Sequence, residues 1–196
     1  LCNDEASFKA TAYVVDLAKQ YNTQLHVSQV SCAKDLALFE PGPVKGKHIT
    51  AATTAQHLWF TNDDYGSLGN LIKCTPSIKS STDKEALFKG LHDHRINVIA
   101  TDHNPHTFKQ KQVGYIDAPA GLPIVQDALL SLLEHTVTER LSILDIVENV
   151  SHNPAIRYGI KDRGFVKEGY FADLVVISDE HKTSSSDSHT RYRCGW

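Results

Sequence analysis

The hydrophobic pattern of this chain alternates between short apolar runs and longer stripes at helical spacing. The short runs, rich in small and β-branched residues, predict strands at residues 25–30, 48–53, 71–75 and 97–101. The stripes, with capping residues and Pro or Gly at their ends, predict helices at residues 4–21, 33–40, 82–91, 123–135, 143–150 and 153–159. Because strands alternate with helices, the pattern predicts βαβ units and a parallel sheet.

The number of strands limits the architecture. Four strands cannot close an eight-stranded barrel, which typically needs about 250 residues. After Gly164 the pattern changes, and residues 165–170 and 172–177 predict two short strands across a glycine turn. Residues 62–66 and 107–123 have no period and predict loops, the second long enough to contact a substrate. Half a barrel followed by a small β appendage is the simplest interpretation.

Composition and charge narrow the functional classes. A net charge of −3 and a pI near 6.4 give no reason to expect nucleic acid or an anionic membrane as a partner. No apolar run approaches the roughly 18 residues of a membrane span. The four cysteines form no CxxC pair, which favours free thiols in a reducing cytoplasm. The chain has no methionine and starts at Leu1, so we expect a piece of a longer protein.

The strand at 97–101 carries the sharpest chemical signal. It ends at Asp102, which is followed by His103 and His106, and Pro105 forces the chain out of the strand. A carboxylate at such a strand end can bind a divalent metal and accept a proton from water, although a capping role in a loop is the structural alternative. His106 could pair with a substrate anion, while His103 is as well suited to bracing the loop.

The other strand ends carry neutral side chains where a metal site needs at least three ligands. Gln29 follows the first strand, Gln56 the second and Thr75 the third. Amides and hydroxyls are poor zinc ligands. His57 is either a pocket residue or a packing partner of the aromatic residues that follow it.

Several segments resemble dihydroorotases, which are cyclic amidohydrolases of the amidohydrolase superfamily. Residues 100–107 (ATDHNPHT) resemble the family's ATDHAPHT strand end, and residues 25–34 resemble its LHVLHISTAK strand. Residues 49–60 resemble ITAEACVHHLWF, and residues 118–123 look like the family's substrate loop. The similarity is collinear and extends to residues 164–176 and to the final RCGW motif.

The resemblance implies the C-terminal half of a (β/α)8 TIM barrel at residues 1–160, part of a β-sandwich at 161–178 and a poorly ordered polar tail at 179–196. It further implies a two-zinc site that activates a hydroxide to open dihydroorotate in the cytoplasmic pyrimidine pathway. The family's HxH pair, its carboxylated lysine and one further histidine would lie in a half that these residues do not contain. The 196 residues alone are therefore expected to be inactive.

Matching positions carry the family's roles onto this chain, with departures at the site itself. Asp102 would be a metal ligand and the general base, His106 would hold the substrate carboxylate, and the backbone around Ala120 and Gly121 would contact the ring. A metal-binding histidine is replaced by Gln29 and a substrate-binding asparagine by Thr75. A glutamate and one of two paired histidines are likewise replaced, by Ala52 and Gln56.

Two hypotheses follow from these departures. The first is a zinc-dependent cyclic amidohydrolase. The second is a catalytically silent dihydroorotase-like subunit that acts as a scaffold or a partner for another enzyme of the pathway. A homo-oligomer fits either hypothesis.

Overall fold

The computed structural model describes residues 3–178 and contains a parallel sheet in the order β1-β2-β3. These strands are β1 (Leu25–Val27), β2 (Ile49–Thr54) and β3 (Val98–Ala100). Leu25 lies opposite Ile49, and Ala52 lies opposite Val98. The predicted α/β class with a parallel sheet is confirmed. The expected polar tail at 179–196 lies outside the described residues.

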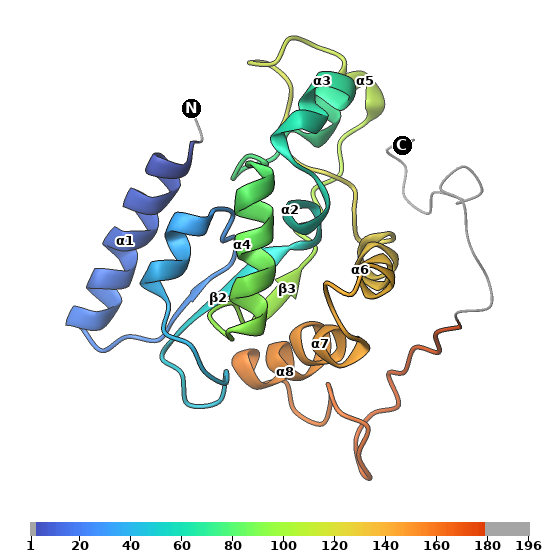
Figure 1. Ribbon diagram of the computed structural model, residues 1–196. Helices are drawn as coiled ribbons and strands as arrows, with labels where there is room; N and C mark the ends of the chain where they lie inside the picture. The colour runs from blue at the N-terminus through green and yellow to red at the C-terminus, as the bar shows by residue number, and fades with distance from the viewer. Residues whose placement is uncertain (1–2, 179–196) are drawn as a thin grey trace.

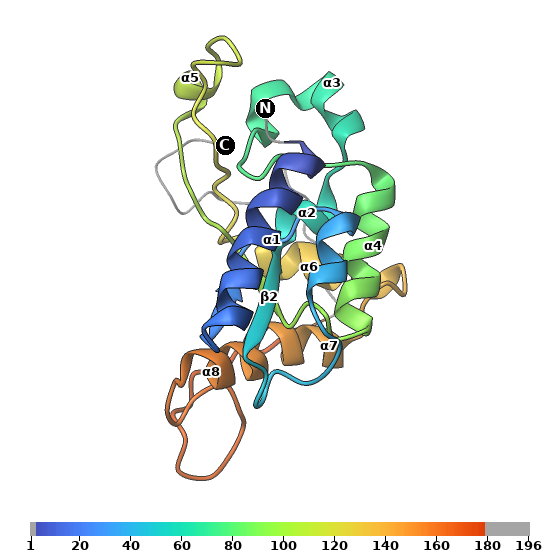
Figure 2. The ribbon, with the colours of Figure 1, turned by 90° about the vertical axis from the view of Figure 1, so that its left-hand side faces the viewer.

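Helices flank the sheet and also lie near the amino ends of its strands (Figures 1 and 2). The long helices α1 (Asp4–Gln20) and α4 (Ser81–His92) flank the sheet together with the 3₁₀-helix η1 (Ala33–Leu38). Near the amino ends of the strands lie α7 (Ile143–Val147) and α8 (Asn153–Tyr158), while α6 (Ala128–Val137) packs against α7. The space between the layers is filled by apolar side chains, among them Val15, Val30, Phe39, Ala51, Leu58, Leu87, Leu91, Ile99 and Leu132.

The predicted helices form and several begin at capping residues, but some of their first and last residues differ from the prediction. Ser142 and Asp145 make the expected capping box of α7, which continues as the π-helix η4 (Glu148–His152). In α4 the box is Ser80 with Asp83, and the helix begins at Ser81, one residue before the predicted start. α8 ends as predicted at Gly159, which has φ +63°. α6 begins five residues later than expected.

The strand predicted at 71–75 is wrong. Residues 71 and 72 belong to the 3₁₀-helix η3 (Gly69–Ile72), and the segment turns at Pro76, which has no N–H for a sheet ladder. Its apolar side chains instead enter a second cluster of Ile72, Cys74, Ile78 and Leu122. The short apolar run is real, but it reports burial here and not strand pairing.

The two strands predicted at 165–170 and 172–177 do not form either. Residues 171–177 have no regular secondary structure, and Val175 and Val176 are 73% and 95% exposed. A strand needs a hydrogen-bonding neighbour, and no part of the described chain pairs with this segment. β propensity alone therefore did not produce a sheet.

Short helical pieces form within both predicted loops. The 62–66 segment forms η2 (Asn62–Asp64) and the start of α3 (Tyr65–Leu68). The predicted loop at 107–123 contains α5 (Phe108–Lys111), which is capped by Thr107 and Gln110. A further helix, α2 (Ala55–Trp59), follows β2 directly. Within residues 3–178, no helix combines the length and the apolar character needed to cross a membrane.

Candidate functional site

Asp102 follows β3 in a backbone conformation that few residues adopt. Its φ is +49°, in the left-handed region, and its side chain is half-buried. The next residues leave the sheet, since the Asn104 N–H donates to the Leu122 carbonyl at 2.9 Å. A left-handed conformation at a non-glycine residue costs on the order of 1 kcal/mol and is frequent at functional sites. The geometry supports Asp102 as the centre of the candidate site.

The Gln29 side chain lies against Asp102 from the end of β1. Burial raises the pKa of the Asp102 carboxyl, and the hydrogen bond from the Gln29 amide opposes this rise. The parallel strands thus bring together two residues that are 73 positions apart in the sequence, as their carboxyl ends meet at one edge. An amide donor, and not a second anionic or imidazole ligand, faces the carboxylate.

The predicted substrate loop meets the chain after Asp102. His106 Nε2 donates to the Ala120 carbonyl at 3.1 Å, and the Asn104 amide donates to the same oxygen. The Gly121 N–H donates to the Lys73 carbonyl at 2.8 Å. His106, Ala120 and Gly121 are therefore assembled in one place, and the contacts just described join the loop to the strand end.

His103 takes the role of a loop brace. Its Nδ1 accepts a hydrogen bond from the Val125 N–H at 3.1 Å, and its backbone bridges to Leu122. This contact matches the structural alternative considered for this histidine.

Thr75 and Gln29 line the same cavity, and Asp102 does not line it. Both line a cavity of about 280 Å³ whose other wall is the first turns of α1. The α1 wall contributes small and uncharged residues, Asn3, Ala6, Ser7, Ala10 and Thr11. The lining residues of this cavity do not include Asp102 or His106. Thr75 thus does not join the His106 group around Ala120.

His57 is a structural residue of α2. Its Nδ1 accepts from the Thr54 hydroxyl at 2.6 Å, and its Nε2 donates to the Pro76 carbonyl at 3.0 Å. Burial lowers the pKa of His57 to about 4, so the ring is neutral at physiological pH. His57 ties the end of β2 to the segment after Thr75, a role that its sequence neighbours did not reveal.

Two other departures from the family pattern are buried beside it. Ala52 is 1% exposed within β2, and Gln56 is fully buried. Neither amide atom of Gln56 has a hydrogen-bond partner among the described residues. These positions supply no carboxylate or imidazole.

The described residues do not fit the two-zinc site that the resemblance implies. No three His, Cys, Asp or Glu side chains within residues 3–178 converge as a metal site would require. The donor set around Asp102 consists of its carboxylate and a neutral amide. Cys32 and Cys74 are free and buried, and burial raises the pKa of each thiol, to about 11 and about 12.

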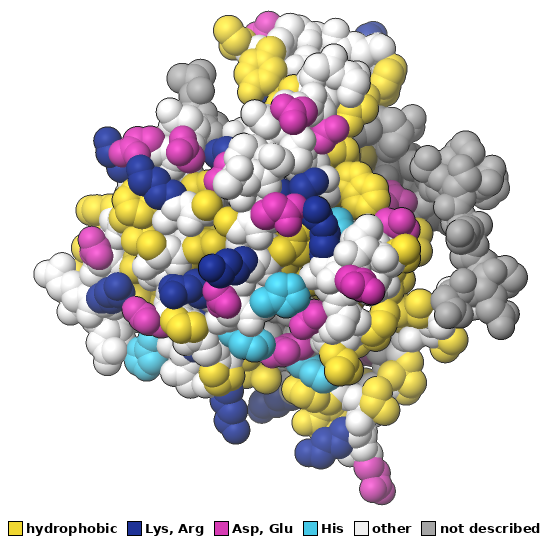
Figure 3. Space-filling model, in the orientation of Figure 1, with side chains coloured by type: hydrophobic (Ala, Val, Ile, Leu, Met, Phe, Trp, Pro, Cys, Tyr) yellow, Lys and Arg dark blue, Asp and Glu magenta, His cyan; other side chains and the backbone are white. Residues whose placement is uncertain are grey.

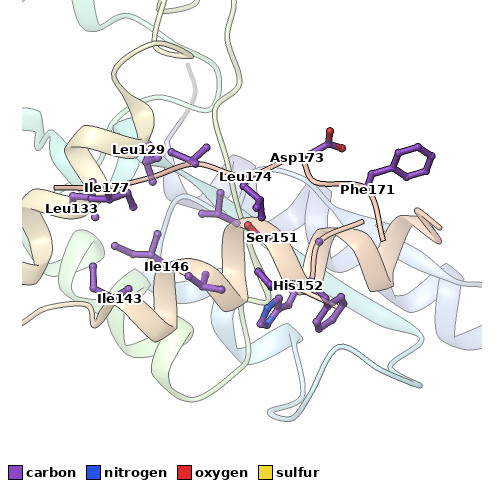
Figure 4. A pocket seen from close by; sticks show the side chains of 16 residues that line it. Leu129, Leu133, Ile143, Ile146, Ser151, His152, Phe171, Asp173, Leu174 and Ile177 are labelled. Carbon is purple, nitrogen blue, oxygen red and sulfur yellow. The ribbon is translucent and has the colours of Figure 1, made fainter. Parts of the chain in front are cut away.

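An apolar cavity elsewhere in the molecule does not belong to this site. It has a volume of about 300 Å³ and lies between α6, α7 and residues 164–177 (Figure 4). His152 stacks on Phe165 at its rim, with ring centroids 4.2 Å apart. Hydrophobic side chains are also exposed where this segment runs, at the lower right of Figure 3. The lining includes none of the predicted site residues.

Comparisons with known proteins agree with this arrangement. The dihydroorotase of Halobacterium salinarum is 31% identical over 194 residues, which are 98% of this chain and 44% of that protein. The dihydroorotase of Anoxybacillus flavithermus is 33% identical over 175 residues, 89% of this chain and 40% of that protein. The chain thus spans less than half the length of these curated relatives. The resemblance to dihydroorotases is confirmed.

Several solved structures share the fold of this chain. The L-hydantoinase (dihydropyrimidinase) of Arthrobacter aurescens superposes with a TM-score of 0.76 at 24% identity, covering 84% of this chain and 38% of its own. A dihydroorotase of Saccharomyces cerevisiae, solved with 5-fluoroorotic acid, gives a TM-score of 0.63 at 21% identity, covering 78% of this chain and 43% of its own. The sequence profile described as the amidohydrolase family matches residues 12–191. The chain therefore belongs to the amidohydrolase family.

Proposed function

We propose that this chain is the C-terminal half of a dihydroorotase-like (β/α)8 barrel that acts on a cyclic amide. Residues 1–160 would form the barrel part and residues 161–178 a segment of a β-sandwich. The observation that supports this most is the meeting of Gln29 and Asp102 at the carboxyl ends of parallel strands. Ligand sites of α/β barrels lie at that end. The open edges of β1 and β3 would pair with the remaining strands of the barrel.

Each predicted residue has a proposed role in ring opening. Asp102 would accept a proton from the attacking water and return it to the ring nitrogen as the C–N bond breaks, which balances the hydrolysis. His106 would hold the substrate carboxylate, and the backbone at Ala120 and Gly121 would contact the ring. Thr75 would act at the position of the family's asparagine. Zinc is implied by the resemblance, but we assign no step to it because the donor set does not fit.

A second candidate function is favoured by one specific contact. Gln29 stands where the family has a metal-binding histidine, and its side chain lowers the pKa of the Asp102 carboxyl against the rise that burial causes. An amide that donates to the carboxylate satisfies it without a cation. The same barrel would then be catalytically silent and act as a scaffold, as a homo-oligomer or beside another enzyme of pyrimidine synthesis in the cytoplasm.

Metal analysis and a dihydroorotate ring-opening assay on the complete natural protein separate the two functions. The amidohydrolase proposal predicts bound metal and turnover that is lost in Asp102→Asn. The silent alternative predicts a folded protein with neither. Stoichiometric zinc with turnover would rule out the silent subunit, and a folded, metal-free, inert protein would rule out the enzyme.

Gln29→His is expected to raise the affinity of the complete protein for zinc by about ten-fold or more. An imidazole at this position would add a ligand beside Asp102 and remove the competing amide donor. Zinc affinity is measured by competition with a chromophoric chelator. Gln112→His, at an exposed position of the 107–123 segment, is the control and should change nothing. Equal affinities for the two variants would contradict the alignment of position 29 with a metal ligand.

A further inference from the structure

Lys111 is a lysine buried in the last turn of α5, where lysines are seldom found. Lys111 is 2% exposed, and its Nζ donates to the Lys73 carbonyl at 3.1 Å and to the Pro119 carbonyl at 3.0 Å. Burial lowers the pKa of this amine to about 8. A buried amine is costly unless carbonyls or carboxylates accept its protons. An apolar side chain would fill the same space at lower cost, so the amine's contribution is to fix the two carbonyls it contacts.

Both carbonyls flank the proposed ligand-contacting residues. Pro119 directly precedes Ala120, and the Lys73 carbonyl also accepts the Gly121 N–H at 2.8 Å. The Lys111 amine thus links the two ends of a three-residue stretch, 119–121. Within that stretch, the Ala120 carbonyl is held by His106 and Asn104.

Lys73 holds the preceding part of the same segment with its side chain. Its Nζ donates to the carbonyls of Tyr115 and Ala118 and lies 4.6 Å from the centroid of the Tyr115 ring. Asn70 adds bonds from its amide to the carbonyls of Lys111, at 3.2 Å, and Val113, at 2.7 Å. The side chains of Asn70 and Lys73 therefore donate to backbone carbonyls all along residues 111–118.

We propose that Lys111 and Lys73 are positioning residues that hold residues 115–121 in the conformation that presents Ala120 and Gly121 to a cyclic-amide ligand, an inference that rests on the proposed function. Lys111 orders residues 119–121, and Lys73 orders residues 115–118. Neither lysine contacts the ligand. Each acts through backbone carbonyls, so the order of this segment would precede ligand binding.

Hydrogen–deuterium exchange of the complete protein, resolved on overlapping peptides, tests this division. In Lys111→Met, exchange at the Gly121 amide should accelerate about ten-fold or more, while peptides from α4 keep their wild-type rates. In Lys73→Met, the acceleration should instead fall on the Ala118 amide, which donates to the Gly114 carbonyl. Lys111→Arg should restore most of the protection. Lys109→Met, an exposed lysine of the same short helix, is the control.

Ligand affinity provides the second measurement. Dihydroorotate should bind Lys111→Met about ten-fold more weakly than Lys109→Met, with partial recovery in Lys111→Arg. Wild-type exchange at residues 115–121 in both methionine variants would overturn the inference. If Lys111→Met fails to fold, Lys73→Met and Lys111→Arg still decide it through the exchange pattern. A wild-type protein that binds no dihydroorotate would instead refute the proposed function, and the exchange data would still report on the positioning.

Discussion

Acidification from pH 7 to pH 4 is expected to cost the fold about 3 kcal/mol through His57 alone. Burial lowers the pKa of His57 to about 4 in the folded protein, while an unfolded histidine titrates near 6.5. Below pH 6.5 the unfolded chain therefore binds a proton that the folded chain does not. The stabilisation is complete above pH 6.5 and is lost as the pH falls toward 4. A pKa difference of about 2.5 corresponds to roughly 3 kcal/mol.

Urea unfolding at pH 7 and at pH 4, in wild type and in His57→Gln, measures this effect. The variant is expected to be less stable at pH 7, because it loses the contact with the Thr54 hydroxyl, but to lose about 3 kcal/mol less on acidification. His92→Gln, at an exposed position at the end of α4, should retain the wild-type pH dependence. Identical pH dependence in wild type and His57→Gln would contradict the assignment.

Gly121→Ala is expected to destabilise the protein by about 2 kcal/mol or more and to weaken ligand binding. Gly121 has φ +138°, which residues with a side chain rarely adopt. An added Cβ would lie 2.6 Å from the Asn104 carbonyl oxygen and 2.7 Å from the Asn104 Cβ. The backbone would have to move, and the contact between His106 and the Ala120 carbonyl would move with it.

Gly114→Ala provides a matched control in the same segment. Its φ is ordinary, and the nearest atom to an added Cβ is the Asp117 Oδ2 at 3.7 Å, a normal van der Waals distance. We expect a change in unfolding free energy within about 0.5 kcal/mol. Both variants are measured by urea unfolding and by dihydroorotate binding. A Gly121→Ala protein as stable as Gly114→Ala would show that the segment adapts, and it would remove the argument that its conformation is fixed.

The elements that the sequence predicted well are those with local causes. Apolar runs ending at polar residues located β1, β2 and β3, and capping residues located α1, α7 and α8. The strand expected at 71–75 failed because a short apolar run also occurs in a turn that packs its apolar residues inward. The strands expected at 165–177 failed because a strand depends on a neighbour that no local pattern supplies.

The candidate site divides in the same way. Asp102 could be proposed as a site residue from the sequence because a buried run that stops at a carboxylate is a local signal. The proximity of Gln29 and Asp102 could be expected only in general terms, because the carboxyl ends of parallel strands lie at the same edge of a sheet. The roles of Lys111 and Lys73 gave no signal, since a lysine in a polar segment has the same pattern whether it faces solvent or buried carbonyls.

The sequence by itself determined the α/β class and the dihydroorotase resemblance, and it singled out Asp102 as the proposed central residue, because periodicity, caps and motif spacing are properties of neighbouring residues. Tertiary structure alone decided that His57 is a neutral brace, that Gln29 acts on the Asp102 carboxyl, and that Lys73 and Lys111 donate to backbone carbonyls of residues 115–119. These depend on which backbone carbonyls and side chains meet across tens of residues. Burial then sets their protonation and hydrogen bonding, and burial is a property of the folded molecule.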